Sequence, residues 1–82
     1  MSTTEMATLG SRCRVFRHLR GLTLGELGLE ADVNISTIWR IETDKVNPSA
    51  ETLMQIAGAL GIGTDVLLGL KNYDPEGDTW TK

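Results

Sequence analysis

The sequence predicts an all-α domain of five short helices. Apolar residues recur at intervals of three and four in successive segments, residues that favour helix caps precede these segments, and glycine or proline separates them. The one candidate for a strand is the short stretch 79–81 around Trp80. With 82 residues and 40% apolar content, the chain can form one small domain with a mostly aliphatic core.

The first predicted helix covers residues 6–20. Leu9, Cys13 and Phe16 lie on one face of it, so we expect Cys13 to be a small buried side chain. Gly21 follows as a residue suited to the left-handed position that ends many helices.

The second and third predicted helices flank a tight polar turn. Thr23 and Glu26 have the spacing of a capping box at the start of the second helix. Asn34 is a good N-cap for the third helix, in which Ile38 and Ile41 face the core. Two helices joined by so few residues cross steeply, and this is the helix-turn-helix geometry of DNA-binding proteins.

Two further helices and a tail complete the prediction. Ser49 is expected to cap a fourth helix that ends at Gly61. Thr64 is expected to cap a short fifth helix, which carries Val66, Leu67 and Leu70. We expect the domain to cover residues 1–70, and residues 71–82 to form an acidic, turn-rich tail that is loose or associated with a dimer.

The composition argues against several classes of protein. The sequence contains no run of about 18 apolar residues, so we expect no membrane span. The N-terminus lacks the basic and apolar segments of a signal peptide. A single cysteine cannot form an internal disulfide, which fits a reducing cytoplasm. No nucleophile motif, phosphate-binding glycine loop or cluster of metal ligands is evident, so we expect no enzymatic activity, no cofactor and no metal.

The net charge of −3 argues against DNA binding, because DNA-binding domains are usually basic. The charge is unevenly distributed, however. Residues 1–42 carry five arginines and five acidic residues, whereas residues 43–82 carry three lysines and six acidic residues. One face could therefore suit phosphates, with an affinity that is weak and sensitive to salt.

An ordered set of residues extends through the five predicted helices. It consists of Arg17, Leu22-Thr23, Leu27-Gly28, Ser36-Thr37-Ile38-Trp39-Arg40-Ile41-Glu42, Asn47-Pro48-Ser49, Thr52-Leu53, Ile56-Ala57, Leu60-Gly61-Ile62 and Asp65-Val66-Leu67-Leu68. With this set the chain resembles the phage repressor/Cro family, also called the xenobiotic-response-element type, over about residues 9–68. The resemblance implies a compact lambda-repressor-like fold. It also implies a sequence-specific transcriptional regulator, a repressor or autoregulator, that reads the major groove of double-stranded DNA with its third helix.

The resemblance also implies which residues contact DNA. Base reading falls on Ile35, Ser36, Thr37 and Arg40. Arg40 is the strongest candidate, because a guanidinium can bond O6 and N7 of guanine together. Phosphate or flanking contacts fall on Thr23, Asn34, Trp39, Thr43, Lys45, Asn47 and Arg14. For Trp39 two environments stay open: the sugar-phosphate wall, or the seam against a neighbouring helix.

Arg17 and Glu42 are expected to form an ion pair between helices one and three, as the resemblance implies. Three positions depart from the family pattern. Leu24 stands where many relatives carry a glutamine that bonds a phosphate, which weakens the expected anchoring. Asp32 stands in place of a turn glycine and is expected to be left-handed, and Gly28 replaces alanine where the two helices approach closely.

Such a regulator is expected to act as a homodimer on a two-fold symmetric operator. Candidate dimer residues are Val66, Leu70, Tyr73 and Trp80. The alternative for Trp80 is a loose tail. Control through a partner protein also fits, because no effector domain is evident.

A rival interpretation is a protein-interaction module of the same fold that has lost DNA binding. The negative charge, Leu24 and the apolar Ile35 and Trp39 favour it. For the regulator, three settings fit equally: a phage repressor, an antitoxin-type autorepressor and a restriction-modification controller. All three place the chain in a bacterial cytoplasm, at the nucleoid.

Overall fold

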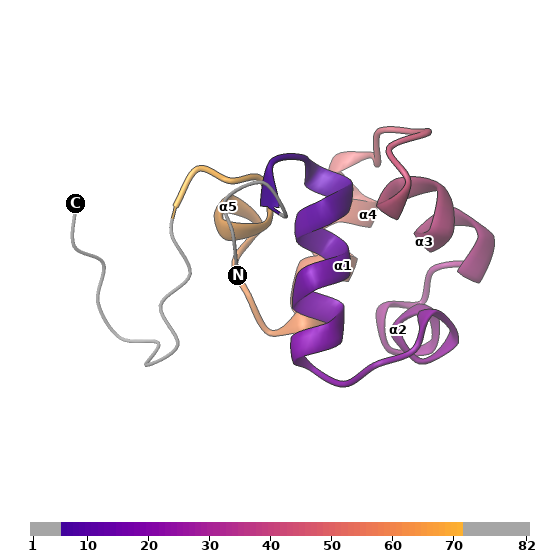
Figure 1. The fold of residues 1–82 in the computed structure, drawn as a ribbon. Coiled ribbons are helices and arrows are strands. Elements are labelled where there is room, and N and C mark those ends of the chain that lie inside the picture. The colour runs from indigo at the N-terminus through magenta and orange to yellow at the C-terminus, as the bar shows by residue number, and fades with distance from the viewer. Residues whose placement is uncertain (1–5, 72–82) are drawn as a thin grey trace.

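Five helices surround one aliphatic core in the computed structural model, which describes residues 6–71 (Figure 1). The helices are α1 (Leu9–Leu19), α2 (Leu24–Ala31), α3 (Ile35–Glu42), α4 (Ala50–Leu60) and α5 (Thr64–Leu67). The all-α prediction is confirmed. Tyr73, Trp80 and the strand expected at 79–81 lie outside the described residues.

The core forms where the apolar faces of the helices meet. α1 packs against α3 and α5, α2 packs against α3 and α4, and α4 packs against α5. Figure 1 shows α3 and α5 on opposite sides of α1. The fully or almost fully buried apolar residues are Cys13, Phe16, Leu27, Ala31, Ile38, Ile41, Ile56, Ala57, Leu60, Val66 and Leu67.

Three of the four predicted N-caps are confirmed. Thr23 and Glu26 form a reciprocal capping box, in which Thr23 Oγ1 accepts from the Glu26 N–H at 3.1 Å and Glu26 Oε1 accepts from the Thr23 N–H at 2.8 Å. Asn34 Oδ1 accepts from the Ser36 N–H at 2.8 Å, and Ser49 Oγ accepts from the N–H of Thr52 at 3.1 Å. These side chains satisfy N–H groups that have no partner within their helices.

The start of the first helix was predicted three residues too early. α1 begins at Leu9 because Thr8 and Ser11 form a capping box: each side-chain oxygen accepts from the other residue's backbone N–H at 3.0 Å. The end of the helix agrees better with the prediction. Gly21 has φ +71°, and the next N–H, of Leu22, donates to Arg17 O at 3.1 Å, which completes a Schellman-type turn.

The fifth helix differs from the prediction at both ends. Its N-cap is Gly63 rather than Thr64, and no side chain caps it. It ends at Leu67, because Gly69 is left-handed (φ +81°) and the Leu70 N–H donates back to Asp65 O at 2.8 Å. Leu70 therefore follows the helix and is 74% exposed.

The turn between α2 and α3 explains two departures from the family pattern. Asp32 has φ +59° and ψ +45°, so the predicted left-handed conformation is confirmed. A Cβ at position 28 would lie 2.7 Å from Val33 O, so Gly28 allows the backbone of the turn to approach α2. The same approach brings the start of α3 against α2.

Candidate nucleic-acid interface

The outward face of α3 is polar at its centre and apolar on its flanks. Ser36, Arg40 and Thr43 are exposed, while Ile38 and Ile41 are buried, as a spacing of 100° per residue predicts. Thr37 is half-buried. The helix therefore presents donors and acceptors along the line that points away from the core.

Arg40 is the cation best placed on this face. Its side chain is exposed, and within residues 6–71 it has no ion pair or hydrogen bond. The carbonyl oxygen of Arg40 accepts from Lys45 N at 2.8 Å and so takes part in the turn after α3. The guanidinium is thus free to bond another molecule.

Trp39 lies beside Arg40 and is 47% exposed. Lys45 Nζ lies 6.0 Å from the centroid of its ring, at the outer limit of a cation–π contact. The hydroxyl of Thr43 donates to Trp39 O at 2.8 Å, so it is engaged inside the protein. The half-exposed ring is accessible on the same surface as Arg40.

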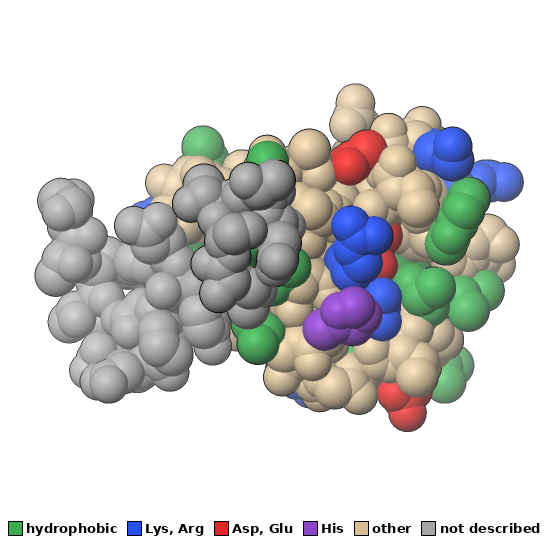
Figure 2. Space-filling model, in the orientation of Figure 1, with side chains coloured by type: hydrophobic (Ala, Val, Ile, Leu, Met, Phe, Trp, Pro, Cys, Tyr) green, Lys and Arg blue, Asp and Glu red, His purple; other side chains and the backbone are tan. Residues whose placement is uncertain are grey.

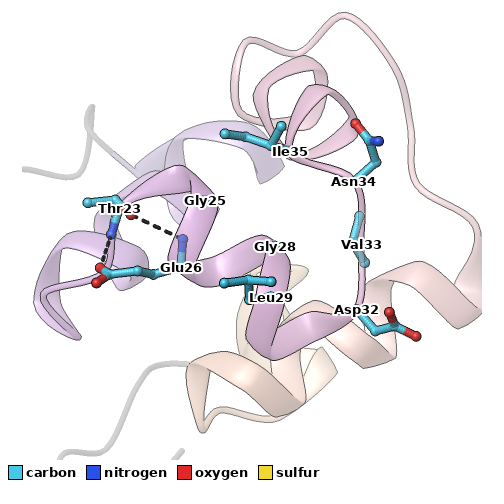
Figure 3. Close-up of a pocket in the computed structure, with 9 residues that line it drawn as sticks. All are labelled: Thr23, Gly25, Glu26, Gly28, Leu29, Asp32, Val33, Asn34 and Ile35. Atoms are coloured by element: carbon cyan, nitrogen blue, oxygen red, sulfur yellow. Dashed lines mark hydrogen bonds between the residues drawn. The ribbon is translucent and has the colours of Figure 1, made fainter.

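A groove separates α2 from the turn and the start of α3 (Figure 3). Figure 3 shows Leu29 and Ile35 on its two sides and the Thr23–Glu26 capping box at one end. The carboxylate of Glu26 occupies the N-terminus of α2, where it satisfies the Thr23 N–H. This end of α2 carries its own negative charge, in accord with the helix dipole.

A buried ion pair joins α1 to α3. Arg17 Nε lies 2.7 Å from Glu42 Oε2, and Arg17 Nη2 lies 3.0 Å from Glu42 Oε1, so the pair is bidentate. Arg17 Nη1 also donates to Leu22 O at 2.9 Å. The hydrogen bond to Glu42 raises the pKa of Arg17 even though burial opposes this. Burial raises the pKa of the adjacent Cys13 thiol from 9.0 to about 12, and Glu42 adds to that shift.

A second tie joins α1 to the loop after α3 and involves Asp44, which no sequence pattern had indicated. Asp44 Oδ2 accepts from Thr8 Oγ1 at 2.9 Å, and Asp44 Oδ1 accepts from the Gly10 N–H at 3.1 Å. Gly10 is required there because a Cβ would collide with backbone oxygens of Ile41 and Glu42. No local pattern indicates this contact, since its partners are more than 30 residues apart in sequence.

The arginines between residues 12 and 20 are less available for contacts with another molecule than their number suggests. Arg12 donates to the carbonyls of Leu67, Leu68 and Met6 at 2.7, 3.1 and 2.9 Å, and thereby holds the end of α5. Arg20 donates to Ala59 O at 2.7 Å and lies 3.6 Å from Glu30. Four arginines lie between residues 12 and 20. Of these, Arg14 is the one that is both exposed and without a partner in the described part of the chain.

Several other predicted residues can now be placed. Asn34, Lys45 and Asn47 are exposed around α3. Val66 was expected to offer an apolar surface for a dimer, and this is wrong: it is 5% exposed because α5 packs it into the core. In residues 6–71 no helix is both long and apolar enough to cross a membrane, and no group of acidic, cysteine and histidine residues could hold a metal ion.

The chain is similar to known regulators. Residues 14–67 match the family described as helix-turn-helix. The immunity repressor protein of Bacillus phage phi105 is 40% identical over 62 residues, which are 76% of this chain and 43% of that protein. The HTH-type transcriptional regulator DdrOP3 of Deinococcus deserti is 35% identical over 66 residues, or 79% of this chain and 51% of that protein.

The chain thus spans about half the length of the curated relatives it matches. Among solved structures, the P22 c2 repressor in complex with a synthetic operator superimposes with a TM-score of 0.71 and 28% identity, over 74% of this chain and 92% of that one. The family match and the shared fold agree with the arrangement of α2 and α3. The chain therefore belongs to the helix-turn-helix family, of the phage repressor/Cro type.

Proposed function

We propose that this chain is a sequence-specific DNA-binding repressor or autoregulator that inserts α3 into the major groove. The observation that carries the proposal is the exposed face of α3, where an unpartnered Arg40 stands between Ser36 and Thr43 on a helix held by the buried Arg17–Glu42 pair. The similarity to an operator-bound repressor supports it. We assign base reading to Ile35, Ser36, Thr37 and Arg40.

The phosphate contacts are assigned to side chains around this face. Arg14 and Lys45 supply the exposed positive charge, and Thr23 keeps a hydroxyl proton that can be donated while its oxygen caps α2. Asn34, Asn47, Trp39 and Thr43 lie at the flanks. Thr43 is the weakest of these candidates, because its hydroxyl already donates to Trp39 O.

The regulator is proposed to bind as a homodimer on a two-fold symmetric operator in the bacterial cytoplasm, because one short helix reads only a few base pairs. With Val66 in the core, the exposed large apolar residues that follow α5 within residues 6–71 are Leu68, at 41%, and Leu70, at 74%. Sedimentation of the full chain and of Leu70→Ser tests this assignment. A loss of the dimer in the variant supports it, and a monomeric wild type contradicts it.

The experiment that tests the function is selection from a random duplex library, run with the wild type, Arg40→Ala and Arg14→Ala. We expect a symmetric motif for the wild type and relaxed specificity at one position of each half-site for Arg40→Ala. Arg14→Ala is the matched control, since loss of a phosphate contact weakens binding to all sequences alike. No enriched motif from folded wild type at low salt would instead favour a protein-interaction module, whose binding would depend little on salt.

A further inference from the structure

The guanidinium of Arg12 joins three segments of the chain at one point. Arg12 lies on α1 and is half-buried. It donates to Leu67 O at 2.7 Å, to Leu68 O at 3.1 Å and to Met6 O at 2.9 Å, so that its partners within residues 6–71 are all backbone carbonyls. A planar guanidinium has donors in fixed directions and therefore holds these carbonyls in one mutual geometry. Arg12 thus ties the chain that enters α1 to the chain that leaves α5.

The short α5 depends on this contact more than a longer helix would. It has four residues and no side-chain cap, and a helix of that length is not stable by itself. Val66 and Leu67 bury it in the core. Arg12 adds a positive charge at its C-terminus, where the helix dipole favours one. The backbone approaches the guanidinium so closely that a Cβ at position 69 would lie 2.9 Å from Arg12 Cζ. The core thus holds α5, and Arg12 fixes the point at which the chain leaves it.

The residues proposed for the dimer follow directly from this point. Leu68 is 41% exposed and Leu70 is 74% exposed. Lys71 Nζ lies 3.3 Å from Asp65 Oδ2, so the chain stays beside α5 after the turn. We propose that Arg12 is a positioning residue that orients this dimer surface relative to α3 and thereby sets the spacing of the two half-sites; the inference rests on the proposed function.

The proposed dimer surface and α3 lie on different sides of the molecule. Figure 1 shows α3 and α5 on opposite sides of α1, and Figure 2 shows Lys and Arg side chains beside hydrophobic side chains at the α2–α3 end. The domain measures 23 Å along its shortest axis, so a rotation of about 10° at α5 moves the far side by about 4 Å, compared with about 3.4 Å for one base-pair step. A small change in the orientation of the dimer surface therefore changes the spacing that fits both recognition helices.

The sequence of each half-site should not depend on Arg12. The contacts that hold α3 to α1 are the Arg17–Glu42 pair and the hydrogen bonds of Asp44, and Arg12 takes part in neither. Loss of the guanidinium should therefore leave the half-site motif unchanged and relax the spacing. A loss of stability alone would weaken binding to every spacing alike. The spacing preference thus separates a positioning role from a merely structural one.

The test uses the full chain and duplexes that carry its two selected half-sites at different spacings. The spacing is lengthened or shortened by a base pair while the half-sites stay the same. We expect the wild type to prefer one spacing by about ten-fold, because the others require the DNA or the protein to twist. In Arg12→Ala this preference should fall to about three-fold or less, and library selection should return the same half-site motif.

Two further variants locate the effect. Arg20→Ala is the matched control, because Arg20 also donates from the end of α1 to a carbonyl, Ala59 O at 2.7 Å, but that carbonyl lies near the end of α4. It should keep the spacing preference of the wild type. Arg12→Lys keeps the positive charge and loses the planar fork, so it should relax the spacing as Arg12→Ala does. It also replaces Arg12→Ala if that variant does not fold. Melting curves give a temperature at which the compared proteins are folded.

Each result that overturns the inference is distinct. A full spacing preference in Arg12→Ala overturns it and leaves the proposed function intact, and a full preference in Arg12→Lys shows that charge rather than geometry is required. Equal relaxation in Arg20→Ala shows that any tie from α1 has this effect, so the assignment to Arg12 is wrong. A wild type that binds single half-sites as a monomer overturns the dimer together with this inference. Failure to select any motif overturns the proposed function as well.

Discussion

Two aspartates in this chain have the same left-handed backbone and different surroundings. Asp32 has φ +59° and Asp44 has φ +60°. The carboxylate of Asp32 has no hydrogen bond or ion pair within the described residues, whereas that of Asp44 accepts from Thr8 and Gly10. The backbone strain is therefore similar at the two positions, and the side-chain contribution is not.

Glycine substitutions should separate these two effects. Asp32→Gly removes strain only, so we expect the free energy of unfolding to rise by up to about 1 kcal/mol and the melting temperature by about 4–8 °C. Asp44→Gly also removes two hydrogen bonds to a charged group, each worth about 1.5–3 kcal/mol, so we expect a lower melting temperature. Thermal unfolding of both variants measures the difference. Stabilisation by both substitutions to the same extent would show that the Asp44 contacts contribute nothing.

Cys13 should make stability sensitive to high pH. Its pKa is about 12 in the folded protein because burial disfavours the thiolate, compared with 9.0 for the free side chain. Between these values the unfolded chain has released the proton and the folded chain retains it, so stability falls as pH rises, by up to about 1.4 kcal/mol per pH unit. Denaturant unfolding of the wild type and Cys13→Ala from pH 7 to 11 measures this slope. Parallel pH profiles for the two proteins would contradict the prediction.

At the scale of elements, α3 is positioned by α1 through polar contacts as well as through the core. The Arg17–Glu42 pair holds the last turn of α3, and Asp44 holds the loop that follows it to the N-terminus of α1. The ion pair depends on two long side chains that cross between the helices. The Asp44 contact depends on the close backbone approach that Gly10 allows. They orient the face that carries Arg40.

Removing one partner of the Arg17–Glu42 pair should destabilise the protein strongly, whereas replacing both partners by apolar residues should destabilise it much less. Arg17→Ala leaves Glu42 buried without its partner, and we expect a loss of about 3–5 kcal/mol in the free energy of unfolding. The double variant Arg17→Met/Glu42→Leu removes both charges and fills a similar volume, so it should recover much of that loss. Chemical denaturation of the three proteins tests this. A melting curve of Arg17→Ala identical to wild type would remove the pair from the account of stability.

The ends of the elements were predictable only where a local signal existed. The starts of α2, α3 and α4 can be predicted from Thr23, Asn34 and Ser49, because the side chain of an N-cap accepts from an N–H two or three residues away. Thr8 and Ser11 form the same kind of capping box, but serine is less usual than Glu or Gln at the N3 position, so this pair is harder to recognise in the sequence. The end of the short α5 differs from the prediction. Gly69 adopts a left-handed conformation, and Arg12 of α1 donates to the carbonyls at the end of the helix, a contact between residues distant in sequence.

At the scale of the whole molecule, the acidic balance and the internal use of arginines limit the charge available for DNA. The chain has a net charge of −3, and Arg12, Arg17 and Arg20 are engaged with carbonyls and carboxylates. Arg14 and Lys45 are exposed and are the cations proposed to contact phosphates, and Arg40 is proposed to contact a base. For the proposed homodimer on its operator, affinity is then expected to come largely from base contacts and from dimer formation.

This distribution predicts that operator binding depends on salt less steeply than that of a protein with six to ten phosphate contacts, and less steeply than the charge balance of the sequence led us to expect. With two phosphates neutralised by each protomer of a dimer, the slope of log Kobs against log salt should be about −4, and affinity should fall by roughly two orders of magnitude between 50 and 200 mM salt. Titration of the selected operator at several salt concentrations measures the slope. A slope of −8 or steeper would mean that Arg12 and Arg20 leave their carbonyls to bind phosphates.

From the amino-acid sequence alone one can predict the five helices, most of their caps, the core face of α3 and the family. These properties follow from side-chain periodicity and from contacts within one turn, which are local. Four features could be known only from the folded structure: which arginines are exposed and unpartnered, that Val66 belongs to the core, that Asp44 ties the loop after α3 to α1, and that Leu24 meets Ile35 and Trp39 in one cleft. Each of these depends on how segments distant in sequence approach one another, and the close packing of a small core sets those approaches.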